Sequence, residues 1–236
     1  MVQARTPERT KELISLSRPE GAEAFGIQLC KLEGEYRCAE VYKELFSFAS
    51  PEPTYVTNYR GHSNVGRCDD ALAEELLKIA ECGATLIDVM GDYFAPCEGE
   101  LTMDAIAVEK QKKLVDELHK RGAEVLMSSH VKRFISEDEV MRIAKEHESR
   151  GADISKIVTG AESIEEEIEN MRIAALLKKE IRIPTLFLAG GECKLLRRLG
   201  GKLGSCMSLC VYEYDELATK NQPLLRDMKI IRDIIP

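Results

Sequence analysis

The hydrophobic positions of the chain follow two alternating patterns. Short apolar runs rich in β-branched residues predict strands, and longer runs with apolar residues three or four positions apart predict amphipathic helices. The helical spacing is clear over residues 69–82, where Leu72, Leu76 and Ile79 share one face and Gly83 follows as a stop signal. The apolar run after Gly83 is typical of a buried strand.

The same reading applied to the whole chain predicts seven strands and eight helices. The expected strands are residues 24–32, 54–60, 84–90, 124–130, 151–158, 184–189 and 205–212. The expected helices are residues 6–18, 39–48, 69–82, 103–121, 136–149 and 163–179, one that begins near Cys193, and residues 224–235. Ser136 with Glu139 has the spacing of a capping box at the start of its helix.

Strict alternation of strands and helices implies a parallel sheet, in either a closed barrel or a doubly wound open sheet. No glycine-rich dinucleotide fingerprint follows the first strands, which weakens the open-sheet alternative. Only residues 2–5 are left for an eighth strand. The predicted fold is therefore an α/β fold, a (β/α)8 TIM barrel with a short or missing first strand, formed by residues 1–236 as a single domain.

Composition narrows the function classes. The chain has 236 residues and a formal net charge of −8, which argues against a protein that binds nucleic-acid phosphates or an anionic membrane surface. The first residues are polar and lack the apolar core of a signal peptide, and no apolar run approaches membrane-spanning length. We expect a soluble, cytoplasmic protein without nucleic-acid or membrane partners. An incomplete barrel edge near the N-terminus would favour a homodimer that covers it.

The eight cysteines are scattered, and no two of them are spaced as CxxC. Several lie in apolar runs, where a free thiol acts as a small hydrophobic side chain. Cys206 and Cys210, with Cys193 upstream, lack the fourth ligand and tight spacing of a zinc site. The sequence predicts reduced thiols, no metal and no cofactor.

One strand carries an unusual residue. The run Gly-Ala-Asp-Ile-Ser-Lys-Ile-Val, residues 151–158, places Lys156 among apolar neighbours. Burial of an ammonium group is costly unless the group is paired or neutralised. The run is therefore either an edge strand whose lysine reaches solvent, or a strand that holds an amine in a low-dielectric cavity, where it can attack a carbonyl.

Strand ends supply further candidates. In a barrel, catalytic groups lie at the C-terminal ends of the strands, and this rule selects Arg60, residues 90–92, His130, Lys156 and the Gly190-Gly191 turn. A lysine could form a Schiff base, a histidine could move protons and an arginine could hold a hydroxylated or anionic substrate. The spacing thus favours carbonyl chemistry, although a strand-end histidine satisfied only by structural hydrogen bonds remains the alternative.

The runs Val-Leu-Met-Ser-Ser-His, residues 125–130, and Gly-Ala-Asp-Ile-Ser-Lys-Ile-Val resemble the histidine and lysine strands of type I 3-dehydroquinate dehydratase, or type I dehydroquinase. The resemblance extends to residues 56–60 (Val-Thr-Asn-Tyr-Arg), 83–88 (Gly-Ala-Thr-Leu-Ile-Asp) and 198–205 (Arg-Leu-Gly-Gly-Lys-Leu-Gly-Ser), with Gln222 beyond them. It covers most of the chain from about Thr6.

The resemblance implies a (β/α)8 barrel that converts 3-dehydroquinate to 3-dehydroshikimate and water, a step of the shikimate pathway of aromatic amino acid biosynthesis. Lys156 would form an imine with the substrate ketone, and His130 would act as general acid and base. Arg60 matches an arginine that contacts substrate hydroxyls. Arg198, or Arg197 given a one-residue ambiguity, matches the arginine that binds the carboxylate, and Gln222 matches a glutamine in a closing loop.

The sequence also departs from the family pattern. Asn64 stands where the family has a glutamate that helps to orient the histidine, and Gln28 with Cys30 replaces a Glu-x-Arg pair. Ala218 replaces a serine near the closing glutamine, and Asp88 or Asp92 could compensate for the lost carboxylates. Two alternatives therefore stay open. One is a related lysine-imine lyase or aldolase for another cyclic ketone or oxo acid, and the other is a non-catalytic binding protein on the same scaffold.

Overall fold

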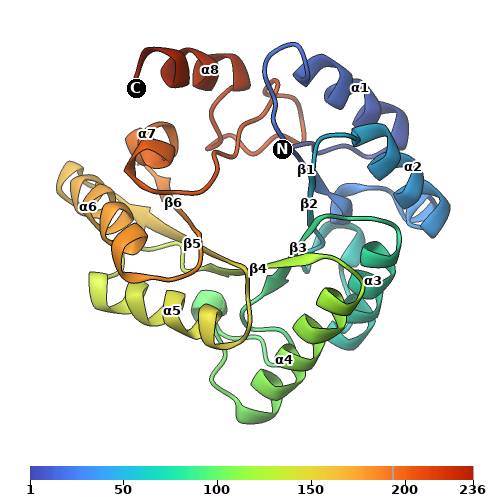
Figure 1. Ribbon diagram of the computed structural model, residues 1–236, viewed down its shortest axis with the longest axis horizontal. Coiled ribbons are helices and arrows are strands. Elements are labelled where there is room, and N and C mark those ends of the chain that lie inside the picture. The colour runs from blue at the N-terminus through green and yellow to red at the C-terminus, as the bar shows by residue number, and fades with distance from the viewer. Residues whose placement is uncertain (193, 236) are drawn as a thin grey trace. The chain divides into compact units, whose positions relative to one another are not determined.

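Strands and helices alternate along the chain in the predicted order (Figure 1). The computed structural model describes residues 1–192 and 194–235. Within them the strands are β1 (Phe25–Gln28), β2 (Thr54–Thr57), β3 (Leu86–Met90), β4 (Glu124–His130), β5 (Ile154–Ala161) and β6 (Thr185–Gly191). They follow one another in the sheet in sequence order. The β1–β2, β2–β3, β4–β5 and β5–β6 pairs are parallel.

The helices also lie close to their predicted positions. They are α1 (Pro7–Ser17), α2 (Ala39–Ala49), α3 (Asp69–Glu81), α4 (Ala105–Lys120), α5 (Glu137–Ser149), α6 (Ile164–Glu180), α7 (Leu195–Leu203) and α8 (Leu225–Ile234). Four short 3₁₀ turns are η1 (Leu29–Lys31), η2 (Gly34–Tyr36), η3 (His62–Asn64) and η4 (Glu98–Glu100). The predicted helix start at Cys193 lies outside the described residues. Among the helices described, none combines the length and apolarity needed to cross a membrane.

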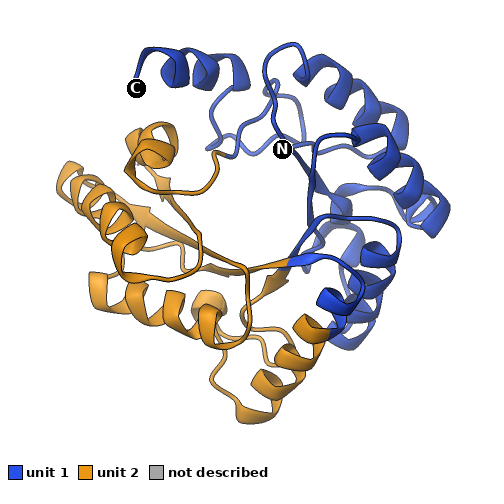
Figure 2. Ribbon diagram, in the orientation of Figure 1, with its two compact units in different colours: residues 1–88, 117–124, 209–236 blue, residues 89–116, 125–208 orange. Residues whose placement is uncertain are grey.

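The chain forms two compact units (Figure 2). Unit 1 consists of residues 1–88, 117–124 and 209–236, and unit 2 consists of residues 89–116 and 125–208. Unit 1 contains β1, β2 and most of β3, whereas unit 2 contains the end of β3 together with β4, β5 and β6. The single domain expected over residues 1–236 stays a prediction.

Residues 2–5 contribute one isolated bridge and no strand among the described residues. Val2 forms a parallel bridge with Ile27, donates its N–H to the Gly26 carbonyl at 2.6 Å and accepts a hydrogen bond from the Gln28 N–H at 3.1 Å. All of these contacts lie within unit 1, and the sheet of the described residues has six strands, of which β1 is the first.

Several predicted strands differ from the structure. The strands predicted over residues 24–32 and 54–60 are shorter than expected: β1 ends at Gln28, where η1 follows, and β2 ends at Thr57. The prediction of a strand over residues 205–212 was wrong: the structure has only a bridge between Val211 and Leu224 there, and Val211 is the one β-branched residue of the segment. Strand β5 does not end before Thr159 but continues to Ala161, paired with Gly191. Gly160 does not form a turn. It lets the backbone near Lys132 approach β5 closely, because a Cβ at this position would lie 3.0 Å from the Lys132 carbonyl oxygen.

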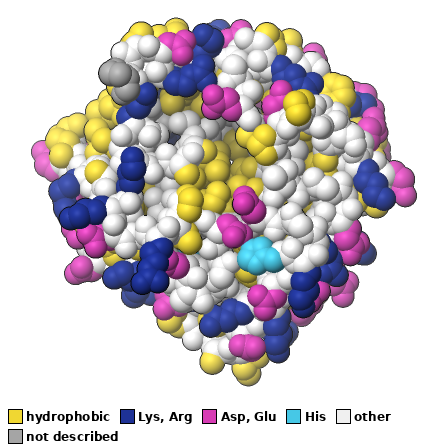
Figure 3. All heavy atoms as spheres, in the orientation of Figure 1, with side chains coloured by type: hydrophobic (Ala, Val, Ile, Leu, Met, Phe, Trp, Pro, Cys, Tyr) yellow, Lys and Arg dark blue, Asp and Glu magenta, His cyan; other side chains and the backbone are white. Residues whose placement is uncertain are grey.

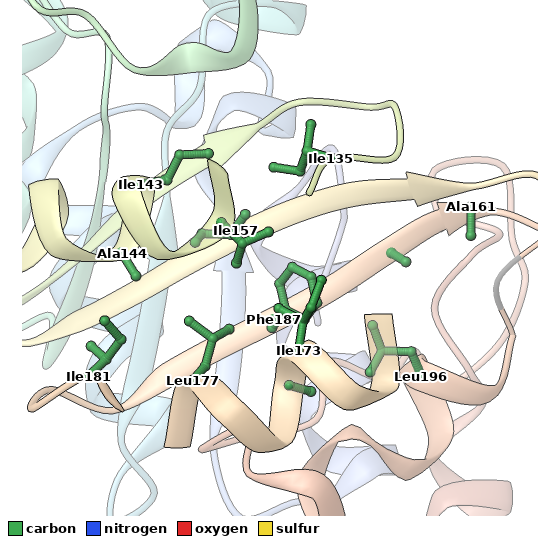
Figure 4. Close-up of a cluster of buried hydrophobic side chains, with 13 residues drawn as sticks. Ile135, Ile143, Ala144, Ile157, Ala161, Ile173, Leu177, Ile181, Phe187 and Leu196 are labelled. Atoms are coloured by element: carbon green, nitrogen blue, oxygen red, sulfur yellow. The ribbon is translucent and has the colours of Figure 1, made fainter. Parts of the chain in front are cut away.

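The core of unit 2 lies between β5 and β6 and the helices that pack on them (Figure 4). Ile157 and Phe187 occupy paired register positions and are each 1% exposed. Because side chains alternate along a strand, the residues on either side of Ile157 point to the opposite face of the sheet. The remaining cluster residues are Ile135, Val140, Ile143, Ala144, Ala161, Ile173, Ala174, Leu177, Ile181, Ala189 and Leu196.

Candidate active site

Lys156 lies on an interior strand of the sheet. Strand β5 pairs with β4 on one side and with β6 on the other, and Lys156 is in register with Ser128 and Leu186. The whole residue is only 4% exposed. The edge-strand interpretation is therefore wrong, because both backbone edges of β5 are hydrogen-bonded within unit 2. The core residue Ile157 faces the helices, so alternation directs the Lys156 side chain to the other face.

His130 ends β4 on the same face as Lys156. Ser128 is the register partner of Lys156, and His130 follows two residues later, opposite Val158. With strands about 4.8 Å apart and a rise of about 3.3 Å per residue, the Cα atoms of His130 and Lys156 are about 8 Å apart. The long lysine side chain can span much of this separation, so one small molecule could contact both groups.

A carboxylate from another loop binds His130. The Nδ1 atom of His130 lies 2.5 Å from Oε2 of Glu100, on the turn η4 between β3 and α4. The His130 and Glu100 side chains are 21% and 27% exposed. An ionised carboxylate only accepts hydrogen bonds, so Nδ1 carries the proton and donates it. In a neutral His130 the other nitrogen, Nε2, is then an acceptor that can take a proton from a substrate.

Buried polar side chains fix the turn that carries Glu100. The Ser129 hydroxyl donates to the Glu100 carbonyl at 2.7 Å and lies 3.0 Å from Nε2 of His147. Since the Ser129 proton is directed at Glu100, the Ser129 oxygen must accept from His147 Nε2–H. The His147 Nδ1 atom lies 2.9 Å from the Ser155 hydroxyl. These hydrogen bonds place His147, fully buried in α5, behind the turn.

Arg150 anchors the same loop from the C-terminal end of α5. Its side chain is fully buried and donates to the carbonyls of Gly91 at 3.0 Å and Thr102 at 2.8 Å. It also donates to Gln111 Oε1 at 2.9 Å and to Glu146 Oε2 at 3.2 Å. Both ends of the loop between β3 and α4 are thus tied to one guanidinium group.

Of the two candidate arginines on α7, Arg197 is the one tied to a strand end. Its Nε atom donates to the Ala189 carbonyl at 2.6 Å, near the C-terminal end of β6. Arg198 donates to the Lys194 carbonyl of its own helix, and that bond is solvent-exposed. Arg197 is therefore the arginine of α7 that is held near the end of β6.

Unit 1 contains the other predicted site residues, and two of them are held by neighbours in that unit. Arg60, at the end of the segment after β2, forms a two-point ion pair with Asp69 at 2.8 and 2.7 Å. Asn64 is 1% exposed and donates to Asn58 Oδ1 and to the Tyr59 carbonyl, both at 2.8 Å. Its own oxygen accepts from Arg67 at 2.8 Å. Asn64 therefore stabilises its own loop.

The two predicted site glutamines of unit 1 differ in their contacts. Gln28 accepts from Gln3 Nε2 at 2.7 Å, and Gln3 also donates to the Thr219 hydroxyl at 2.8 Å. Gln222 is 7% exposed, and its Oε1 atom has no hydrogen-bond partner among the described residues. An amide oxygen in this state is suited to accept a hydrogen bond from a bound hydroxyl.

The residues named as possible replacements for the lost glutamate have other contacts. Asp88 accepts from the Tyr59 hydroxyl at 2.6 Å and from the Tyr55 hydroxyl. Burial and the Asp88 charge raise the pKa of Tyr59 well above its ordinary value. Asp92 accepts from the Cys97 N–H at 3.0 Å and so shapes its loop.

Sequence reasoning missed Glu100 as the carboxylate at His130. The signal available was weak: two acidic residues around a glycine, in a loop after a strand. Among the described residues no group of three or more potential metal ligands occurs. Acidic and basic side chains are interspersed over the face shown in Figure 3.

The class of protein that these features define is a (β/α) barrel: its parallel strands alternate with helices, with a buried lysine on β5 and a histidine at the end of β4. A model of the type I 3-dehydroquinase family matches residues 32–234. The chain belongs to the type I 3-dehydroquinase family, a family of hydro-lyases.

Individual relatives agree with this assignment. The 3-dehydroquinate dehydratase of Alkaliphilus oremlandii (strain OhILAs) is 30% identical over 94 residues, which are 39% of this chain and 37% of that protein. The match thus spans little more than a third of the relative's length. The 3-dehydroquinate dehydratase structure from Geobacillus kaustophilus HTA426 has a TM-score of 0.84 at 15% identity and covers 99% of this chain and 88% of that one.

A second solved structure has the same fold. The type I 3-dehydroquinate dehydratase of Clostridium difficile, with covalently modified comenic acid, has a TM-score of 0.81 at 15% identity. The similarity covers 99% of this chain and 90% of that chain. At these identities the structural likeness establishes the fold, and it confirms the barrel class predicted from the strand–helix alternation.

Proposed function

We propose that this chain dehydrates 3-dehydroquinate to 3-dehydroshikimate through an imine on Lys156. The observation that carries the proposal is the arrangement on β4 and β5: a 4% exposed lysine on an interior strand, with a histidine–carboxylate pair two register positions away on the same face. A buried amine beside a proton-transfer pair is what imine chemistry requires. Membership of the type I 3-dehydroquinase family supports the choice of substrate.

The reaction can be written with these groups. The Lys156 amine adds to the substrate ketone, and loss of water leaves a protonated imine. Nε2 of His130 then takes a proton from the carbon next to the imine, and the electron pair moves into an enamine. The enamine expels the β-hydroxyl group, which leaves as water with the proton returned by His130. Hydrolysis of the imine releases 3-dehydroshikimate and restores the amine.

Recognition of the substrate is assigned to arginine and amide groups. We assign the substrate carboxylate to Arg197 rather than to Arg198, because the bond to Ala189 fixes Arg197 at the end of β6. The role of Arg60 toward substrate hydroxyls and the role of Gln222 in a closing loop stay predictions. The roles predicted for Gln28 and Asn64, the homodimer and the cytoplasmic location stay predictions.

A second candidate function is imine chemistry on another cyclic ketone or oxo acid. The observation that favours it is that Gln28, which together with Cys30 replaces the charged Glu-x-Arg pair of the family pattern, is paired with another neutral amide, that of Gln3. Neutral amides at this position would bind substrate hydroxyls through hydrogen bonds and would not bind a second anionic group of a substrate.

Borohydride trapping and enone absorbance test the proposal. The wild-type protein treated with borohydride in the presence of 3-dehydroquinate should gain the mass of the ligand at Lys156. Without borohydride, the wild-type protein should convert 3-dehydroquinate to a product with enone absorbance. The Lys156→Ala variant should lose both signals. Lys145→Ala, which removes an exposed lysine from α5, is the matched control and should retain both.

The outcomes separate the candidates. Turnover in the Lys156→Ala variant would refute the imine mechanism. A folded wild-type chain that traps another ketone but does not turn over 3-dehydroquinate would favour the second candidate. Absence of an adduct with every ketone tried would leave the non-catalytic alternative.

A further inference from the structure

We propose that Glu100 is the positioning residue of His130, and that it supplies from the loop between β3 and α4 the carboxylate that the family pattern places at the position of Asn64. This inference rests on the proposed function, since it assigns His130 a proton-transfer role. It concerns a residue that sequence comparison alone does not select, because Glu100 lies on a different loop from Asn64.

The contact itself has the geometry of an orienting bond. The His130 Nδ1 and Glu100 Oε2 atoms are 2.5 Å apart, which places them in direct hydrogen-bond contact. The bond fixes the ring orientation and keeps the proton on Nδ1, so that Nε2 is the acceptor nitrogen of a neutral ring. A carboxylate in this place also stabilises the imidazolium that forms when His130 accepts a proton.

The backbone of Glu100 is unfavourable for a residue with a side chain. Its φ is +52°, in the left-handed region that favours glycine, and the preceding Gly99 has φ of +78°. Such a conformation persists only where the surroundings over-determine it. Ser129 binds the Glu100 carbonyl at 2.7 Å, and the Glu100 N–H donates to the Cys97 carbonyl at 3.2 Å.

Ser129 also links the two partners of the pair. It immediately precedes His130 on β4, and its side chain holds the backbone of Glu100. The strand that carries the histidine therefore directly positions the turn that carries the carboxylate. Arg150 and His147 hold the rest of the loop and Ser129 in place from α5. A surface ion pair would need none of this support, because long exposed side chains pair without a fixed backbone.

Asn64 does not offer a similar contact within its own unit. Both of its donated hydrogen bonds go to residues of unit 1, and its oxygen accepts from Arg67. The residue at the family's glutamate position has thus become part of a loop-stabilising network. Glu100 provides the negative charge from within unit 2.

The test compares Glu100→Gln and Glu100→Ala with Glu98→Gln, which removes an exposed carboxylate from the same turn. For both Glu100 variants kcat for 3-dehydroquinate should fall by about 10- to 100-fold, part of the 10²–10⁴ that a general base contributes. Borohydride trapping at Lys156 should remain at the wild-type level. The deuterium isotope effect on proton abstraction should rise, and formate should partly restore Glu100→Ala. Glu98→Gln should behave as wild type.

Proton NMR provides a readout that needs no substrate. The wild-type chain should show the downfield Nδ1–H resonance of a histidine hydrogen-bonded to a carboxylate. This resonance should be lost in Glu100→Gln and in His130→Gln, and kept in Glu98→Gln. Wild-type kcat in Glu100→Gln, or a resonance that survives this substitution, would overturn the inference.

The inference would also be overturned if the Glu100 variants lost both borohydride trapping at Lys156 and turnover of 3-dehydroquinate. This result would mean that Glu100 supports the fold or imine formation rather than His130. A wild-type chain with no activity on 3-dehydroquinate would instead refute the proposed function, and the resonance would then decide the Glu100–His130 bond by itself.

Discussion

Replacement of Arg197 by glutamine tests how the substrate carboxylate is bound. Arg197 is the third residue of α7, and its Nε atom is fixed by the Ala189 carbonyl at 2.6 Å. Arg198, the next residue, donates to the carbonyl of Lys194, the N-cap of its own helix, in a solvent-exposed bond. Arg198→Gln therefore removes the same charge one position away and serves as the matched control.

The expected magnitude follows from the bonds that would be lost. Hydrogen bonds between an arginine and a carboxylate contribute about 1.5–3 kcal/mol. At about 1.4 kcal/mol per factor of ten, loss of this contact should raise KM for 3-dehydroquinate by roughly 10- to 150-fold. Loss of the Ala189 bond should lower the free energy of unfolding by about 1 kcal/mol. Arg198→Gln should change KM by less than about twofold, because exposed contacts contribute little.

Steady-state kinetics on the acid and on its methyl ester provide the assay. The wild-type chain should discriminate against the ester, which lacks the anionic group, and Arg197→Gln should lose most of this discrimination. Circular dichroism of each variant controls for folding. A larger KM increase in Arg198→Gln than in Arg197→Gln, or unchanged ester discrimination in Arg197→Gln, would refute the assignment.

Two further predictions concern unit 1. Glu75 is buried in α3 and accepts from the Tyr42 hydroxyl at 2.6 Å and from Arg37 at 2.7 Å. Burial works against its ionisation, but these hydrogen bonds outweigh burial and hold the pKa of Glu75 below its ordinary value. Its stabilising contribution is therefore present above about pH 4.5 and lost as the pH falls through the lower folded-state pKa. Glu75→Gln should lower the free energy of unfolding in urea by about 3 kcal/mol at pH 7, with a smaller difference below pH 4.5, and an equal difference at both pH values would contradict this. Burial also raises the pKa of the Cys210 thiol to about 11, so at pH 8 only about 0.1% of it is thiolate. Mass spectrometry after brief iodoacetamide treatment should find the exposed Cys68 alkylated well before Cys210, and comparable rates would show that Cys210 is accessible.

Local signals in the sequence predicted most of the secondary structure. Strand β4 has the predicted bounds, and the capping box at Ser136 is present, with the Glu139 N–H donating to the Ser136 hydroxyl at 3.3 Å. Such elements are encoded within a few residues, so pattern analysis finds them. The prediction of a strand over residues 205–212 failed because a short apolar run does not specify the strand with which it pairs. Its Cys206 N–H donates to the Thr185 carbonyl, but no ladder follows.

The candidate site was predictable only where it follows from strand topology. Parallel strands bring their C-terminal ends to one edge, which is why Lys156 and His130 could be selected together. Glu100 could not be selected, because the shape of its loop is set by contacts that are remote in sequence, with Ser129 and Arg150. The choice between Arg197 and Arg198 depended on where α7 begins, and helix termini are poorly defined by sequence.

The hydrogen bonds from Arg150 to both ends of the loop between β3 and α4 have a consequence for the order of folding. Its hydrogen bonds reach 59 residues back to Gly91, 48 back to Thr102 and 39 back to Gln111. Closing such long loops costs chain entropy before any contact repays it, so these bonds form after local helices and neighbouring strands. We therefore expect the left-handed turn at Glu100 to form late in folding, once α5 has docked, and the Glu100–His130 contact to form with it.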